Sequence, residues 1–179
     1  MIESHSFGDI SLFIAPIVRR DGDSRSEAEH RTVAGLVKFA LGPSAEIGHR
    51  PSGAPYIIGD DISFSVSHSR SHAAIALSRS SVVGVDIEEQ RQQLARVAPR
   101  VLSDDELLEY STPRLFLQAW TLKEALYKAA LTPGLDFRKD IGLPLPVGSH
   151  MATVECRRYK VISILTTPVY TLALVSSEN

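Results

Sequence analysis

The chain has 179 residues, of which 44% are hydrophobic, and its mean hydropathy is zero, which suits a globular protein with one substantial core or two small fused ones. Its formal charge of −2 argues against a nucleic-acid partner, and no apolar run is long enough to span a membrane. The single cysteine, Cys156, and a first segment unlike a secretion signal lead us to expect a cytoplasmic protein.

Turn signals and a helix-capping pattern divide the first half of the chain into a strand, a helix and several short strands. An apolar run over residues 10–18 predicts a strand. A capping box formed by Ser24 and Glu27 predicts a helix over 24–41. Residues 45–88 then alternate short apolar stretches with turn residues, which indicates a meander or a small sheet.

The second half repeats the order of helix and then strands. The pattern predicts a short helix over 91–98 and a second capping box at Ser103 and Glu106. Thr112 and the proline that follows it open a long helix that reaches about residue 131. Three strands are then predicted over 152–158, 160–166 and 168–175.

The most informative strand is the segment Val83–Glu88. Side chains alternate along a strand, so Gly84, Asp86 and Glu88 share one face and the three apolar residues share the other. Two carboxylates on one face repel each other, and they require either solvent or a cation beside them. Hard oxygen ligands suit magnesium. Exposed edge strands carry such pairs as well, so the pair alone indicates either a surface edge or a metal site.

The long helix carries a second cluster of charged residues. Residues four apart share a helix face, which aligns Trp120, Glu124 and Lys128, with Lys123 beside them. An ordinary amphipathic helix with a surface ion pair would give the same pattern. A third candidate is His68, which follows a strand rich in serines. It fits a phosphate-binding residue or a plain surface histidine, and Arg31 is equally open.

Taken in order, these segments resemble the phosphopantetheinyl transferase family, specifically its surfactin-synthetase-type group, in which two similar halves are fused in one chain. The matching segments are His30–Thr32, Ser65–Ser69, Gly84–Glu88, Leu102–Glu106 and Trp120–Lys128. The resemblance implies an α+β fold of two similar α/β halves, each with a helix packed on a small, mostly antiparallel sheet. The expected halves are residues 1–88 and 89–179, forming a monomer with the active site between them.

The resemblance also implies an activity: transfer of the 4′-phosphopantetheine group of coenzyme A to a serine of an apo acyl or peptidyl carrier protein. Asp86, Glu88 and Glu124 would hold Mg²⁺, with Mn²⁺ as an alternative. The catalytic base would be Glu124 or a water on the metal. Lys128 would stabilise the leaving phosphate, and Lys123 would assist.

The same resemblance assigns the contacts with coenzyme A to one serine and four basic residues. These are Ser67, His68, Arg31, Arg19 and Arg50. Many family members have lysines where this chain has Ala54 and Pro133, so coenzyme A affinity is open; Arg50 is a candidate substitute. Two other functions remain as alternatives. One is a non-catalytic module that binds coenzyme A or a carrier protein, and the other is a metal-dependent nuclease.

Overall fold

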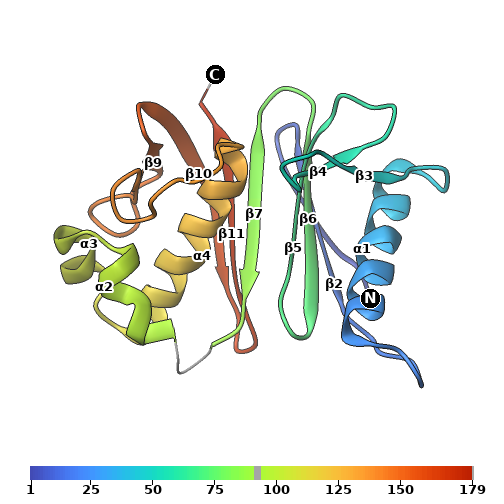
Figure 1. Cartoon of the computed structure of the whole chain (residues 1–179), viewed down its shortest axis with the longest axis horizontal. Helices are drawn as coiled ribbons and strands as arrows, with labels where there is room; N and C mark the ends of the chain where they lie inside the picture. Colours follow the sequence, from blue (N-terminus) through green and yellow to red (C-terminus); the bar gives the residue numbers. More distant parts are fainter. Residues whose placement is uncertain (91–93, 179) are drawn as a thin grey trace.

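Two halves, each with a helix on an antiparallel sheet, make up the computed structural model, which describes residues 1–90 and 94–178 (Figure 1). The first elements are β1 Glu3–Phe7, β2 Ile10–Pro16, α1 Arg25–Leu41, β3 Ile47–His49, β4 Pro55–Ile57, β5 Ser63–His68 and β6 His72–Ser78. They are followed by β7 Val83–Glu88, η1 Leu94–Val97, α2 Ala98–Val101, α3 Asp104–Glu109, α4 Pro113–Ala130, β8 Ile141–Gly142, β9 Met151–Val154, β10 Arg157–Thr166 and β11 Thr171–Ser177. The predicted α+β class is confirmed.

The strands form two larger sheets and one small hairpin. The first sheet has the order β1-β2-β6-β5, the second has the order β7-β11-β10-β9-β8, and β3 pairs with β4. All the pairs are antiparallel. Because β7 pairs with β11, it belongs to the second sheet. The chain therefore crosses between sheets after Ser78 and before Val83, earlier than the expected division at residue 88.

Local capping chemistry sets the helix boundaries where the sequence predicts them. Ser24 and Glu27 form the capping box of α1, and Ser103 and Glu106 form that of α3. The Thr112 side chain caps α4. Of the predicted helix over 91–98, residues 91–93 lie outside the described residues, and the rest forms η1 and the start of α2. No helix in the described ranges has the length and apolar character needed to cross a membrane.

The strand predictions are less accurate near the C-terminus. A tight turn at Glu155 and Cys156, with Glu155 at a φ of 53°, separates β9 from β10. The strand β10 then runs unbroken to Thr166, so the predicted break near residue 159 is wrong. Two elements were not predicted. The strand β1 is mostly exposed and therefore lacks an apolar alternation, and β8 has only two residues.

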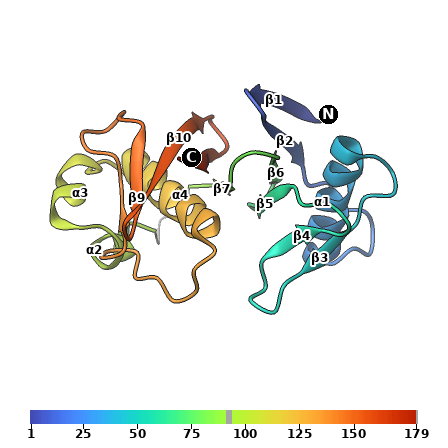
Figure 2. The ribbon, with the colours of Figure 1, turned by 90° about the horizontal axis from the view of Figure 1, so that it is seen from above.

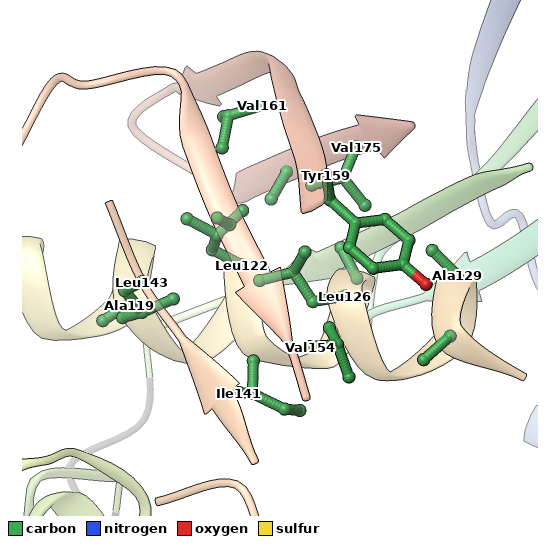
Figure 3. Close-up of a cluster of buried hydrophobic side chains, with 14 of the residues drawn as sticks. Ala119, Leu122, Leu126, Ala129, Ile141, Leu143, Val154, Tyr159, Val161 and Val175 are labelled. Carbon is green, nitrogen blue, oxygen red and sulfur yellow. The ribbon is translucent and has the colours of Figure 1, made fainter. Parts of the chain in front are cut away.

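Three apolar clusters separate four layers, in the order helix, sheet, sheet, helix. The helix α1 packs on the outer face of the first sheet, and α4 packs on the outer face of the second (Figure 2). Figure 3 shows the cluster between α4 and the second sheet, in which Leu122 and Leu126 of α4 meet Val154 and Tyr159 of the sheet. In the middle cluster, the inner faces of the two sheets meet through β2, β6, β7 and β11. Val83, Val85 and Ile87 lie in this middle cluster, as the alternation along β7 predicts.

A row of serines joins the two sheets edge to edge. The row comprises Ser63, Ser65, Ser67, Ser69 and Ser71, every second residue of β5 and of the turn after it. The hydroxyls of the first three accept hydrogen bonds from the backbone N–H groups of Val83, Val85 and Ile87, at 3.0, 3.0 and 3.3 Å respectively. The hydroxyls of the last two donate to one carboxylate oxygen of Glu89. The backbone N–H groups on the edge of β7 that faces β5 are thus satisfied by side chains instead of a neighbouring strand.

Candidate functional site

The site begins with a close approach between β7 and α4 at Gly84. A Cβ atom at this residue would lie 2.0 Å from the carbonyl oxygen of Ala125 and 2.9 Å from the Cβ of Ala129. The backbone of α4 fills the space beside Gly84 and leaves no room there for a bulky anion. The missing side chain instead lets α4 lie directly on β7, which brings Glu124 and Lys128 beside Asp86.

Asp86 is the most constrained carboxylate of the site. It is 4% exposed, and its Oδ1 accepts hydrogen bonds from Ser67 Oγ and Lys128 Nζ, both at 2.7 Å. Its Oδ2 is buried and has no hydrogen-bond partner among the described residues. A buried carboxylate oxygen without a donor is costly, so this atom points to a cation that the protein itself does not provide.

Glu124 carries the largest electrostatic perturbation of the site. Burial, together with the negative charges of Asp86 and Glu88, raises its pKa to about 7, although the Lys128 ammonium opposes that shift. These interactions show that the three carboxylates and the lysine share one electrostatic environment. A carboxyl group with this pKa exchanges its proton near neutral pH, as suits a general base.

The three acidic residues fit a hard divalent cation by their carboxylate chemistry and by the buried Asp86 Oδ2, which has no hydrogen-bond partner among the described residues. They do not surround a common point: within residues 1–90 and 94–178, no three acidic, histidine or cysteine side chains are gathered as a ready metal site. Lys128 contributes to this arrangement, because its ammonium occupies the space beside Asp86 Oδ1 and also donates to the Val85 carbonyl at 3.2 Å.

Lys123, expected to assist catalysis, lies in the interior of the second half. Its side chain is fully buried and forms an ion pair with Glu106 at 2.8 Å. Its Nζ also donates to the carbonyl oxygens of Phe137 and Ile141, both at 2.7 Å. Burial lowers the pKa of Lys123, and Glu106 opposes that effect. The Lys123 ammonium therefore contacts Glu106 in the interior and not the carboxylate of Asp86. This contact supports the fold.

Ser67 and His68, both expected at coenzyme A, have different surroundings. The Ser67 side chain is buried and its hydroxyl is engaged by Asp86 and the Ile87 amide, which does not match the expected contact with a phosphate. His68 is 44% exposed at the end of β5, and its Nδ1 lies 3.6 Å from Glu29 Oε1. The imidazole is accessible to a ligand, as the prediction requires.

The three arginines expected at coenzyme A interact within the first half. Arg31 donates to Asp23 and to the carbonyl of Val18, and it holds the pKa of Asp23 below its usual range. Arg19 donates to the backbone carbonyl of Asp23 at 2.8 Å. These contacts fix the loop between β2 and α1. The guanidinium of Arg50 lies 5.4 Å from the ring centre of Tyr56.

A pocket of about 250 Å³ lies between the two halves, next to Lys128. Its walls include Ala54 and Phe64 from the first half, and Tyr127 and Pro133 from the second. Ala54 and Pro133 are the two positions where lysines were expected, so both substitutions fall on the same pocket. Lys128 is the one basic residue among its lining residues in the described part of the chain.

Sequence reasoning identified Glu124 and Lys128 because they are one helical turn apart, and it missed the partners that are distant in the chain. Glu106 was recognised only as a helix cap, although it also accepts the Lys123 ammonium. Glu89 was not considered, although it accepts three hydrogen bonds from the turn between β5 and β6. The regular spacing of the serines in the sequence was the available signal for the hydrogen bonds that join the two sheets, including those to Glu89.

Comparison with known proteins supports a family for this constellation. Residues 82–163, which include β7 and α4, match the family model of the 4′-phosphopantetheinyl transferase superfamily. No curated protein matched the chain. The family match supports a transferase of this general kind.

Proposed function

We propose that this chain transfers the 4′-phosphopantetheine group of coenzyme A to a serine of an apo acyl or peptidyl carrier protein, and that it belongs to the two-half, surfactin-synthetase-type group. The observation that carries the proposal is the cluster of Asp86, Glu124 and Lys128 on β7 and α4. A carboxyl with a pKa of about 7 stands there beside a buried carboxylate oxygen without a donor and beside an ammonium.

Magnesium is the proposed metal, with Mn²⁺ as an alternative, and Asp86, Glu88 and Glu124 are its proposed ligands. When bound, it would neutralise negative charge on the diphosphate of coenzyme A. Lys128 would have to leave Asp86 Oδ1, at least in part, for the carboxylates to close on one point. Its side chain is long and 30% exposed, which allows such a movement.

The proposed reaction is a displacement at phosphorus. The carrier serine Oγ attacks the phosphorus that bears the pantetheine arm, and Glu124 accepts the hydroxyl proton. The bond from that phosphorus to the bridging oxygen breaks, and adenosine 3′,5′-bisphosphate leaves. Lys128 stabilises the negative charge that develops on the leaving phosphate. The products are the holo carrier and the bisphosphate.

The pocket between the halves is the proposed place for part of coenzyme A, because Lys128 lines it and also contacts Asp86. His68 is a proposed contact for its phosphates, and Arg19, Arg31 and Arg50 remain weaker candidates. With Ala54 and Pro133 in the walls, attraction between this pocket and the anionic substrate rests on Lys128. The fused halves favour a monomer, and we propose a cytoplasmic location.

The test is mass spectrometry of a panel of apo carriers incubated with the protein, coenzyme A and Mg²⁺. Wild type should add one phosphopantetheine group to at least one carrier. Asp86→Asn and Glu124→Gln should lower the rate by at least about 100-fold, the effect of removing a group that stabilises charge in the transition state. Asp61→Asn, which changes an exposed aspartate, is the matched control and should keep the wild-type rate.

Transfer by either site variant at nearly the wild-type rate would contradict the assignment of these residues. Binding of coenzyme A in calorimetry without any product, across the whole panel, would favour a non-catalytic binding module. Magnesium-dependent cleavage of DNA would favour a nuclease.

A further inference from the structure

The two oxygens of the Asp86 carboxylate have different surroundings, and this asymmetry has a structural cause. Oδ1 accepts from both Ser67 and Lys128, whereas Oδ2 has no hydrogen-bond partner among the described residues. Both donors therefore act on the same side of the carboxylate. The two oxygens of a carboxylate are chemically equivalent, so the donors on Oδ1 act by fixing the orientation of the carboxylate plane.

Ser67 is the more rigid of the two donors. Its hydroxyl accepts a hydrogen bond from the Ile87 amide at 3.3 Å, one residue after Asp86 on the same strand. A hydroxyl has a single proton, and that proton is directed to Asp86 Oδ1 at 2.7 Å. The side chain has one rotatable carbon–carbon bond and is buried on β5. Lys128, by contrast, reaches Asp86 along a flexible four-carbon chain that is partly exposed.

We infer that Ser67 is a positioning residue for Asp86, which holds Oδ1 from the first half of the chain so that Oδ2 is presented to the cation. The inference rests on the cation site of the proposed function and deepens it. It replaces the phosphate contact that the sequence suggested for Ser67, and it makes the metal site depend on both halves. Residues that orient metal ligands typically change metal affinity by about 10–100-fold when they are removed.

The serine row offers a matched control. Ser63 lies on the same strand and face as Ser67, and its hydroxyl accepts from the Val83 amide at 3.0 Å. The hydrogen bonds described for Ser63 involve no carboxylate. Ser63→Ala and Ser67→Ala therefore both leave a β7 amide without its acceptor, but only Ser67→Ala removes the donor from Asp86. Ser67→Thr keeps the hydroxyl.

The experiment is a titration of the full chain with Mn²⁺ alone, in which free Mn²⁺ is measured by electron paramagnetic resonance. Ser67→Ala should weaken Mn²⁺ binding about 10-fold. Ser63→Ala should stay within about twofold of wild type, and Ser67→Thr should restore most of the affinity, because the supporting hydrogen bond is present in both. Urea denaturation should show that both alanine variants still unfold cooperatively from a folded state, which separates the metal effect from loss of the fold.

Equal Mn²⁺ affinities for Ser67→Ala and Ser63→Ala would overturn the inference. A wild-type chain that takes up no Mn²⁺ would overturn it too, together with the cation site. The outcome for the transferase activity is separate. A chain with the predicted serine dependence that modifies no carrier would refute phosphopantetheine transfer and leave the positioning role of Ser67 intact.

Discussion

Two lysines on α4, five residues apart, have opposite surroundings, and the difference comes from the faces they occupy. Lys128 is partly exposed beside Asp86, and it can move when a ligand arrives. Lys123 is fully buried, and its ammonium contacts Glu106 and two backbone carbonyls. At the scale of single residues, charge alone therefore does not identify a functional lysine. The groups that surround the charge decide whether it supports the fold or the chemistry.

Replacement of Lys123 tests its structural role. Lys123→Met leaves the Glu106 carboxylate buried without its partner, which should lower the free energy of unfolding by about 3–5 kcal/mol. The measurement is urea denaturation. Lys139→Met is the control, because Lys139 is exposed and its ion pair with Asp136 spans 3.9 Å, so its loss should change stability little. A Lys123→Met chain as stable as wild type would contradict the structural role.

Glu124 should make the stability of the metal-free protein depend on pH. Its pKa is about 7 in the folded chain against an ordinary value of 4.5, so between these values the folded state binds an additional proton. The stability that this proton confers is complete below pH 4.5 and is lost as the pH rises through 7. One proton corresponds to a slope of at most about 1.4 kcal/mol per pH unit.

The check is urea denaturation of wild type and Glu124→Gln at pH 5, 6, 7 and 8 with a chelator present. Wild type should lose stability relative to the variant as the pH rises from 5 to 7, and the difference should level off above 7. The comparison with the variant removes the contributions of the histidines, which titrate in the same range. Parallel curves for the two proteins would contradict the raised pKa of Glu124.

At the scale of elements, the contact between β7 and α4 positions the site, and Gly84 permits that contact. The backbone carbonyl of Ala125 occupies the space that a side chain would need. The strand and the helix are 24 residues or more apart in the chain, and they meet because both bury apolar faces in adjacent clusters. Glu124 and Lys128 then reach Asp86 without a long loop to carry them.

Gly84→Ala should disrupt this contact. The added methyl group meets backbone at 2.0 Å, so α4 must shift, and overpacking of this kind costs about 1–3 kcal/mol. Gly35→Ala is the control: Gly35 lies within α1, and nothing stands within 4 Å of the added Cβ. That change should stabilise the chain by about 0.5–1 kcal/mol. In urea denaturation, the midpoint of Gly84→Ala should fall and that of Gly35→Ala should rise. Equal shifts of the two midpoints would contradict the close approach of α4 to Gly84.

Sequence reasoning succeeded where a feature depends on neighbours in the chain. The capping boxes, the alternation along β7 and the face shared by Glu124 and Lys128 all follow from local periodicity, and the structure agrees with each. It failed where a partner is distant. Neither the pairing of β7 with β11 nor the contact of Gly84 with α4 has a local signature. Glu106 illustrates both outcomes. Its role in the capping box of α3 was predicted from the sequence, and its buried ion pair with Lys123 was not.

At the scale of the whole molecule, Glu89 and the serine row hold the halves together. Glu89 follows β7 directly and accepts hydrogen bonds from the hydroxyls of Ser69 and Ser71 and from the Ser71 amide. Burial raises the pKa of Glu89, but the hydrogen bonds from Ser71 and Ser69 outweigh that effect and leave the pKa below its ordinary value of 4.5. The carboxylate therefore contributes stability in its charged form.

Glu89→Ala should loosen the turn between β5 and β6 and lower stability by about 1–3 kcal/mol at neutral pH, because it removes a partly buried acceptor from three donors. A depressed pKa means that this contribution is present above pH 4.5 and is lost as the pH falls below it. Glu46→Ala, which changes an exposed glutamate, is the control. Denaturation at pH 7 and at progressively lower pH provides the check, and a deficit that does not shrink as the pH falls would contradict the role of the charge.

The row of serines also affects the distance between the facing edges of the two sheets. Strands joined by backbone hydrogen bonds lie about 4.8 Å apart. Here the three connections to β7 run from a backbone amide to a serine hydroxyl, so the two edges stand further apart than a continuous sheet would allow. The short side chain of serine thus acts as a spacer, and a bulkier or an apolar residue in its place would alter how far the entrance beside Lys128 stands open.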